Sequence, residues 1–261
     1  MENFLMQKIA QALHDARLGG HSLPQFSKEL SEFKREDAYT IQELGIKLRE
    51  ETGEKVIGLK MGLTSEGKRQ QMNLDAPLYG VLTDKMKIEN EGTFSLKGSI
   101  HPKIEPEVAF SIKSELKGKV SREEVLDATE AICAALEILD SRFDGFKYFS
   151  MEDVISDNSS SSHYILGPKL TNFKNLDLKD LSMRMKVDGE TLMEGNSREI
   201  SGDPVVSVIQ LAELLAQRGK SIPAGTFVLA GAATAAIALK PGMVVSLEVD
   251  SLPNLSVTIK E

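Results

Sequence analysis

Apolar positions near the N-terminus recur at the spacing of an amphipathic helix. In residues 1–17 the apolar positions that share one helical face are Phe4, Leu5, Ile9 and Leu13. A second run, over residues 35–54, places Ala38, Ile41, Leu44, Ile46 and Leu48 near the same spacing, and Gly53 marks its end. The pattern predicts two helices in the first part of the chain.

From about residue 57 the pattern changes to short β-rich runs separated by Gly, Pro, Asn and Asp. The runs cover residues 55–63, 79–86, 105–112, 183–190, 225–232 and 243–250. They predict an irregular, mostly antiparallel sheet. One helix is expected to interrupt it, starting at the capping-box pair Ser121 and Glu124, with Val125, Ile132 and Leu136 as its core contacts.

Composition limits the classes of protein and partner. A chain of 261 residues with 41% hydrophobic content can bury a large core, as one domain or as a small domain joined to a larger one. The net charge of −8 argues against a nucleic-acid partner, because phosphate binding needs clustered Lys and Arg. A small-molecule partner is therefore favoured.

Three features predict a cytoplasmic protein without membrane spans. The first helix carries Glu2, Gln7 and Lys8, where a signal peptide needs an unbroken apolar core. The longest uncharged run, residues 224–239, is shorter than the about 20 apolar residues that a span requires. The single cysteine, Cys133, excludes an internal disulfide and is expected to be a buried, inert thiol in a reducing compartment.

Glu105 and Glu107 flank Pro106 in a predicted strand. Side chains two apart on a strand share a face, roughly 6.5–7 Å apart at their bases, so both carboxylates can converge on one ion. Proline is typical of strand edges, strand starts and bulges, which suits a face that lines a cavity. The alternative is a solvated edge strand with alternating polar residues.

A third carboxylate, that of Glu137, lies in the apolar run "AALEILDSR". An unpaired buried charge there is costly, so Glu137 needs a partner. Three carboxylates predict a hard divalent cation, Mg²⁺ or Mn²⁺, rather than zinc, which prefers Cys and His. In the same run, Asp140 and Arg142 are expected to pair, either to orient Glu137 or as a structural salt bridge.

Five segments, in this order, resemble one family. They are "GLKMGLTSEGKRQQMNLDAPLYGVLTDKM", "KIEPEVAF", "ALEILDSRF", "ISDNSSSSHYILG" and "AGTFVLAGAATAAIALKPGMVVSLEVDSLPNLSV". From about residue 35 onward the chain resembles the hydratase and decarboxylase branch of the fumarylacetoacetate hydrolase superfamily. The resemblance implies an α+β fold, with an N-terminal helical region at 1–80 and a metal-binding mixed β-roll catalytic domain at 81–261. It also implies one Mg²⁺ or Mn²⁺ on an E-x-E pair and a later Glu, which match Glu105, Glu107 and Glu137.

The expected reaction follows from the resemblance. It is the metal-dependent decarboxylation of 2-oxo-3-hexenedioate to 2-hydroxypenta-2,4-dienoate in aromatic meta-cleavage catabolism. The conjugated 2-keto group accepts the electron pair that remains when CO₂ departs. A metal chelated by the C1 carboxylate and the C2 oxygen makes this group a stronger electron acceptor. The family also implies an oligomer, associated with the pathway hydratase that receives the unstable dienol.

Two residues are assigned catalytic roles. Lys60 lies in the apolar, glycine-flanked run "VIGLKMGL", where an ordinary surface lysine is unusual. It is expected either to hold a substrate carboxylate or to protonate the dienolate. Asp75 precedes Pro77 and is either a turn former or a hydrogen-bonding group of the site.

Four residues are assigned to substrate binding. The hydroxyls of Ser160 and Ser161 can bind a carboxylate, unless the serine segment, "SDNSSSSHY" at residues 156–164, is a flexible surface loop. Thr234 is the polar member of "GAATAA", which is expected to bring backbone close to the substrate. Leu78 stands where related hydratases often carry an acid, and an aliphatic wall there disfavours the departing carboxylate's charged form.

Three other functions remain open. A hydratase acting on 2-hydroxypenta-2,4-dienoate shares the metal site. An acylpyruvate hydrolase needs a base for water, and His163 is the histidine beside the serine segment. A non-catalytic binding subunit of the same fold would require the three carboxylates to be lost or otherwise occupied, and all three are present.

Overall fold

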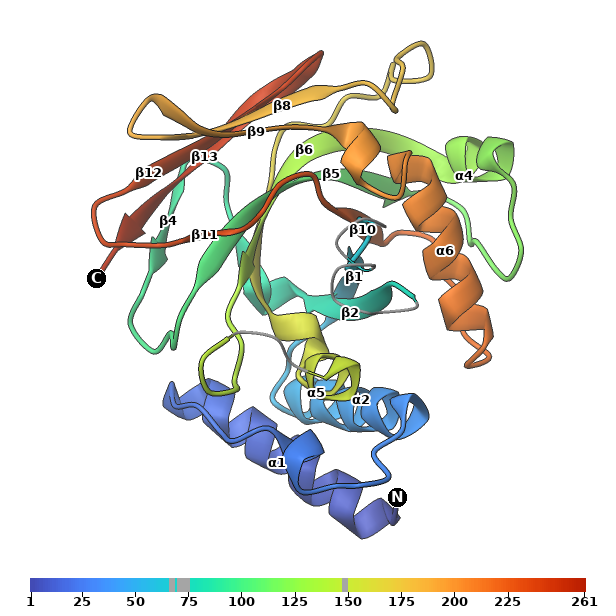
Figure 1. Cartoon of the computed structure of the whole chain (residues 1–261). Helices are drawn as coiled ribbons and strands as arrows, with labels where there is room; N and C mark the ends of the chain where they lie inside the picture. Colours follow the sequence, from blue (N-terminus) through green and yellow to red (C-terminus); the bar gives the residue numbers. More distant parts are fainter. Residues whose placement is uncertain (66–68, 70–75, 147–149) are drawn as a thin grey trace.

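The computed structural model describes residues 1–65, 69, 76–146 and 150–261. Its first part is a pair of packed helices, α1 (Asn3–Gly19) and α2 (Arg35–Glu51), joined by the short helix η1 (Phe26–Lys28), and both predicted helices are confirmed. Their shared core contains Ile9, Leu13 and Ile41 together with Phe143. The pair lies at one end of the molecule (Figure 1). Tyr39 of α2 stacks on Tyr79 at 4.5 Å between ring centroids, which attaches the helices to the sheet.

The larger sheet has eight strands among the described residues, and it curls around an interior (Figure 1). In spatial order its strands are β2 (Leu78–Thr83), β1 (Val56–Gly62), β10 (Phe227–Ala232), β5 (Lys103–Ile112), β6 (Thr129–Leu139), β7 (Ser161–Leu166) and β3 (Lys87–Ile88), with β11 (Ile237–Ala238) paired to β5. Only β1 with β10 and β3 with β7 are parallel pairs in this sheet of the described chain. The prediction of a mostly antiparallel sheet is confirmed.

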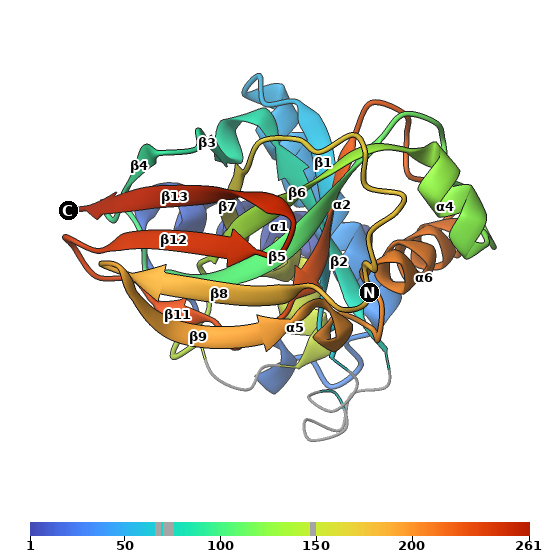
Figure 2. The same ribbon diagram turned by 90° about the horizontal axis from the view of Figure 1, so that it is seen from above.

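The second sheet covers the outer face of β5 and β6. Its five strands are β4 (Gly92–Ser95), β13 (Leu252–Lys260), β12 (Val244–Val249), β8 (Ser182–Val187) and β9 (Glu190–Asn196). Figure 2 shows β13, β12, β8 and β9 side by side. Val108 of β5 and Leu136 of β6 share one buried cluster with Leu247 and Val257 of this sheet. The core therefore fixes the outer face of β5 and β6, and their inner face is left for the site.

The remaining helices correct the prediction in two places. They are α4 (Arg122–Ala128), α5 (Met151–Ser156), α6 (Pro204–Ala216), η2 (Asp84–Met86), η3 (Asn158–Ser160) and η4 (Ser197–Glu199). The Ser121 capping box is confirmed, but α4 ends at Ala128. Ile132 and Leu136 lie instead on β6, because a central strand buried on both faces reads as an unbroken apolar run. Helices α5 and α6 were not predicted, although Asp203 caps α6 and Pro204 is its first residue.

These elements together confirm the α+β fold. The region 1–80 contains α1 and α2, and also β1 and the start of β2, which belong to the eight-stranded sheet. The division at residue 80 stays a prediction. No helix in the described part of the chain is long and apolar enough to cross a membrane.

Candidate metal centre

Three carboxylates meet on the inner face of β5 and β6. Glu105 of β5 is the direct cross-strand partner of Glu137 on β6, and Glu107 follows two residues later on the same face. One ligand oxygen from each of the three lies within 4.8 Å of the others. Glu107 and Glu137 are both 0% exposed, whereas Glu105 is half-buried. The predicted trio is therefore brought together.

A bulge in β10 holds Glu107. The register between β10 and β5 shifts between Leu229 and Ala232, and the Gly231 N–H donates to Glu107 Oε2 at 2.6 Å. Gly231 has φ 113°, and a Cβ there would lie 2.4 Å from Thr64 Oγ1, so the position requires glycine. The other oxygen, Oε1 of Glu107, is buried and has no hydrogen-bond partner among the described residues. This oxygen remains available for a ligand.

Lys60 holds Glu137. Its Nζ lies 3.2 Å from both carboxylate oxygens, and both side chains are buried. The Ser161 hydroxyl donates to Glu137 Oε1 at 3.1 Å. A Cβ on Gly80, which pairs with Lys60 across β1 and β2, would lie 3.1 Å from Lys60 Cε, so glycine leaves room for the lysine stem.

The charges of the centre call for a cation. Among these four side chains, three ionised carboxylates and one ammonium leave two negative charges, and two of the carboxylates are fully buried, which is costly without compensation. Desolvation, followed by the charges of Glu137 and Glu105, raises the pKa of Glu107 well above its usual range. A divalent cation cancels this charge, and a donor set made only of carboxylate oxygens fits Mg²⁺ or Mn²⁺.

The serine segment is rigid rather than a flexible surface loop. Asn158, Ser159 and Ser160 are buried and have φ of 49°, 55° and 56°, a left-handed turn that non-glycine residues adopt only when held. Asn158 Oδ1 accepts the Val81 N–H, and its Nδ2 donates to the Val81 carbonyl, both at 2.8 Å. Ser159 Oγ donates to the Tyr79 carbonyl at 2.8 Å. The segment is thus anchored to β2.

A buried arginine fixes the other side of this segment. The Arg142 guanidinium and backbone N–H donate to the carboxylate of Asp157, and its Nη1 donates to the Ser161 carbonyl at 3.2 Å. The predicted pairing of Arg142 with Asp140 is wrong for the side chains. The Asp140 carboxylate instead accepts the backbone N–H groups of Ile100 and His101, at 2.9 and 2.8 Å. Sequence alone could not identify Asp157 as the partner, because the pairing depends on the turn.

The other predicted residues lie at different places around the centre. A Cβ on Gly62 would lie 2.7 Å from Leu78 Cδ1 and 3.8 Å from Lys60 Nζ. Leu78 and the Lys60 ammonium therefore lie beside the same glycine. Thr234 is 7% exposed and follows β10, and its hydroxyl donates to the Ala235 carbonyl at 3.1 Å. Asp75 lies outside the described residues.

His163 is turned away from the carboxylates. On β7 it pairs with Ile138, whereas its neighbour Tyr164 pairs with Glu137, so the His163 side chain lies on the opposite face. Its ring lies 4.9 Å from that of Phe94. Burial lowers the pKa of His163 to about 4. It is therefore a neutral, structural histidine and not a base beside the metal centre.

Comparisons with known proteins give one consistent family. The family model described as "Fumarylacetoacetate (FAA) hydrolase C-terminal" matches residues 60–260. The chain is 41% identical over 251 residues to a 4-oxalocrotonate decarboxylase of a Pseudomonas species, covering 96% of each chain. It is 33% identical over 258 residues to a 2-hydroxyhexa-2,4-dienoate hydratase of Comamonas testosteroni, covering 98% of this chain and 96% of the hydratase.

A solved structure agrees over nearly the whole chain. It is the 4-oxalocrotonate decarboxylase from Pseudomonas putida G7 complexed with magnesium and adipate, with a TM-score of 0.96 at 33% identity, covering 99% of this chain and 98% of that one. The match extends through the N-terminal helices as well as both sheets. This chain therefore belongs to the fumarylacetoacetate hydrolase family.

Proposed function

We propose that this protein is a metal-dependent carboxy-lyase that converts 2-oxo-3-hexenedioate (4-oxalocrotonate) to 2-hydroxypenta-2,4-dienoate and CO₂. The observation that carries the proposal is the trio of carboxylates with Lys60 paired to one of them, in a chain that matches 4-oxalocrotonate decarboxylases over nearly its whole length. The ligand of the solved relative supports the substrate class, because adipate is also a six-carbon dicarboxylate.

Glu105, Glu107 and Glu137 are the residues that would hold Mg²⁺ or Mn²⁺. Bound there, the cation supplies a Lewis acid for the 2-oxo-carboxylate end of the substrate. The Gly231 N–H fixes one oxygen of Glu107 and leaves the other for the cation. Lys60 and Ser161 together set the orientation of Glu137.

Lys60 and Leu78 act on the substrate side of the centre. Lys60 brings a positive charge into a pocket that must receive a dianion, and its ammonium can donate a proton to the dienolate. Leu78 borders that ammonium with an apolar surface. An apolar wall favours the delocalised charge of the transition state over a localised carboxylate, which promotes loss of CO₂. Asp75, Ser160 and Thr234 are further residues that we assign to the site.

The competing activities are separated by their products. Purified protein is given 2-oxo-3-hexenedioate and, separately, 2-hydroxypenta-2,4-dienoate, and CO₂ release and water addition are followed. We expect CO₂ from the first substrate. Consumption of only the second, to give 4-hydroxy-2-oxopentanoate, would make the protein a hydratase. A hydrolase would instead cleave an acylpyruvate into two organic acids, and the orientation of His163 away from the carboxylates disfavours it.

We further propose that the protein is cytoplasmic, forms an oligomer and associates with the pathway hydratase. The product dienol ketonises in water, so direct transfer to the next enzyme protects it. Size-exclusion chromatography with light scattering, with and without the hydratase, tests the association. A monomer that does not co-elute would refute it.

A further inference from the structure

A second cavity lies between the N-terminal helices and the strands β3, β4 and β7, and it shares Ser161 with the metal centre. Its volume is about 470 Å³, which is within the range of small-molecule sites. Ser161, Ser162 and His163 of β7 form one wall, and Ile88 and Phe94 contribute an apolar one. Neither Lys60 nor any of the three carboxylates of the metal centre lines it.

The lining of this cavity is strongly basic. Its positively charged residues are Arg17, Arg49, Lys85, Lys87, Lys97 and Arg142, and its acidic residues are Glu54 and Asp140. Three of these charges already have partners: Asp140 accepts the N–H groups of Ile100 and His101, Arg142 is paired with Asp157, and Lys87 is paired with Glu89. Arg17, Arg49, Lys85 and Lys97 then face Glu54 alone. Such an excess of cations is unexpected in a chain with a net charge of −8. The cavity therefore attracts anions.

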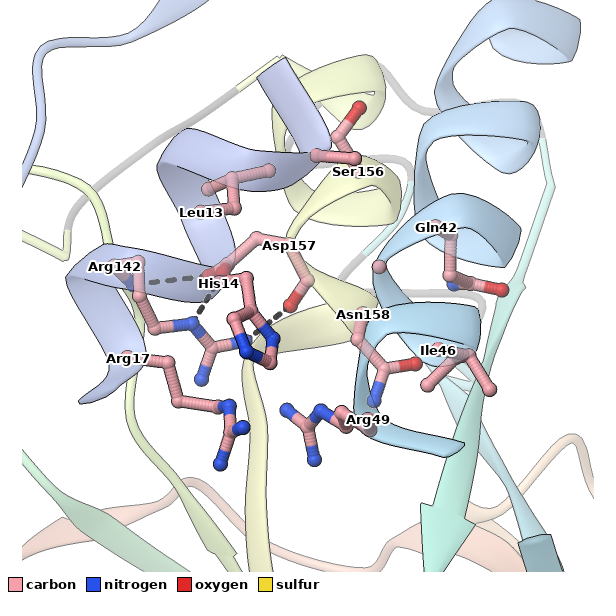
Figure 3. Close-up of a pocket in the computed structure, with 12 residues that line it drawn as sticks. Leu13, His14, Arg17, Gln42, Ile46, Arg49, Arg142, Ser156, Asp157 and Asn158 are labelled. Carbon is pink, nitrogen blue, oxygen red and sulfur yellow. Dashed lines mark hydrogen bonds and ion pairs between the residues drawn. The ribbon is translucent and has the colours of Figure 1, made fainter. Parts of the chain in front are cut away.

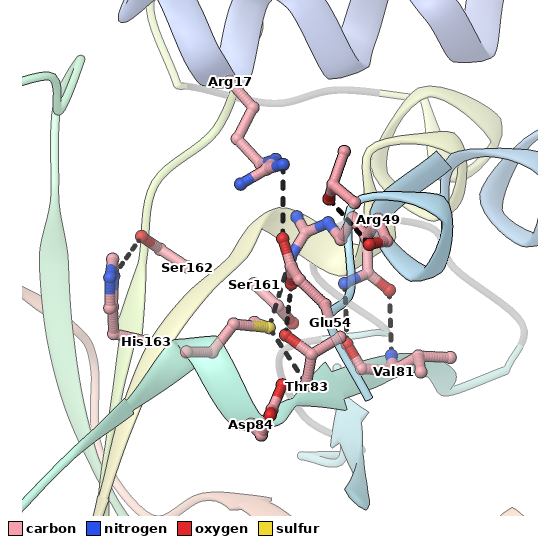
Figure 4. A network of polar contacts seen from close by, with 12 residues as sticks. Arg17, Arg49, Glu54, Val81, Thr83, Asp84, Ser161, Ser162 and His163 are labelled. Carbon is pink, nitrogen blue, oxygen red and sulfur yellow. Dashed lines mark hydrogen bonds and ion pairs between the residues drawn. The ribbon is translucent and has the colours of Figure 1, made fainter. Parts of the chain in front are cut away.

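Two arginines in this wall share one carboxylate. Arg17 Nη2 lies 3.5 Å from Glu54 Oε1, and Arg49 Nη1 lies 3.9 Å from Glu54 Oε2, so neither pair has the close geometry of a strong charge-assisted bond. Glu54 Oε2 also accepts the Thr83 hydroxyl at 2.5 Å (Figure 4). Glu54 therefore only partly compensates the two guanidinium groups.

The guanidinium groups have unused donors. The buried Nε of Arg17 has no hydrogen-bond partner among the described residues. Arg49 Nη1 donates to the thioether of Met86 at 3.3 Å, and sulfur is a weak acceptor. Figure 3 shows the neighbouring pocket around His14, and there the guanidinium groups of Arg17, Arg49 and Arg142, which line both cavities, lie close together. Burial, with the charges of Arg17 and Arg142, lowers the pKa of Arg49 to about 9. The long contact with Glu54 does not offset this effect of burial and of the two neighbouring arginines.

We infer that this cavity is a binding site for a small dianion, in which Arg17, Arg49 and Lys97 supply the recognition. Planar guanidinium groups bind both carboxylate and phosphate oxygens by paired hydrogen bonds, so a short dicarboxylate and a tetrahedral oxyanion share the required chemistry. The anion would take up the donors that Glu54 leaves free. The inference concerns residues outside the metal centre and does not depend on the reaction proposed there.

The test measures anion binding to full-length, Mg²⁺-loaded protein by isothermal titration calorimetry at constant ionic strength. The probes are sulfate, for a tetrahedral oxyanion, and succinate, for a dicarboxylate. The variant Arg17→Gln with Lys97→Gln removes two cations of the cavity and leaves Arg49 with Glu54. The control, Lys117→Gln with Lys119→Gln, removes the same charge from exposed positions between β5 and α4.

We expect saturable binding of at least one probe to wild type and control, weakened at least tenfold in the cavity variant. The probe that shows this difference identifies the class of anion. Equal affinity in the variant and the control, or no saturable binding of either probe to wild type, would overturn the inference. If the double variant does not fold, judged by circular dichroism, Lys97→Gln alone is compared with Lys119→Gln by the same criterion.

Discussion

Replacing Lys60 with Met tests the centre most directly, because one buried ammonium contacts Glu137 and faces the substrate side. Methionine keeps most of the stem volume, so the packing against Gly62 and Gly80 is retained. The substitution removes the ammonium that lies 3.2 Å from both carboxylate oxygens of Glu137. The net charge of the ionised, metal-free centre then changes from two negative charges to three.

Removing one partner of a buried ion pair costs about 3–5 kcal/mol. The lower end applies here, because Ser161 still donates to Glu137 and the carboxylates can take up a proton as their charges crowd. With a shift of about 2–4 °C per kcal/mol for a chain of about this size, about 3 kcal/mol lowers the melting temperature of metal-free protein by about 6–12 °C. Mg²⁺ should recover much of this loss, since it replaces the missing positive charge.

The assay combines thermal unfolding in EDTA and in Mg²⁺ with steady-state CO₂ release from 2-oxo-3-hexenedioate. We expect kcat/KM of the metal-loaded variant to fall at least about tenfold, which is about 1.4 kcal/mol of transition-state stabilisation. Lys119→Met, at an exposed position, is the control and should match wild type in both measurements. A Lys60→Met protein with unchanged melting temperature in EDTA and unchanged kcat/KM would refute the reasoning.

Three further predictions follow from the same contacts. Glu107→Gln should weaken Mg²⁺ binding by more than the about hundredfold seen for outer-shell residues, and an unchanged calorimetric Kd would show that Glu107 is not a ligand. Gly80→Ala places a Cβ 3.0 Å from the Asn158 carbonyl oxygen and 3.1 Å from Lys60 Cε, so kcat should fall while the protein stays folded. A wild-type kcat would show that the serine segment and Lys60 move to accommodate the added methyl group. Burial raises the pKa of Cys133 to about 12, so the thiol stays protonated at pH 8 and should react with a disulfide reagent only after denaturation; rapid labelling of native protein would contradict this.

The sequence was sufficient to predict the features that depend on residues close together in the chain. The helices α1 and α2 could be predicted because the apolar positions of an amphipathic helix recur about every 3.6 residues along the chain. The capping box at Ser121 was readable for the same reason, since its two members lie in one turn. Glu105 and Glu107 could be placed on one face because strand geometry alternates every residue.

Other features were decided by contacts between distant segments. Helix α4 stops at Ala128 because the following residues gain a full ladder of hydrogen bonds with β5, and this pairing puts Glu137 opposite Glu105. Local pattern cannot separate such a buried strand from a buried helix. The apolar run around Glu137 and the resemblance to the family both predicted Glu137 as a ligand, but the register between β5 and β6 creates the site.

The serine segment shows most clearly the difference between what local sequence predicts and what tertiary contacts decide. Its composition reads as a flexible loop, yet Asn158 completes the hydrogen bonding of Val81 on β2, and the Arg142–Asp157 pair closes it from the other side. Those partners are distant from one another in sequence, and the left-handed turn is adopted only because they hold it. The sequence determined which side chains were available for the centre, whereas tertiary hydrogen bonds and strand register determined where they point.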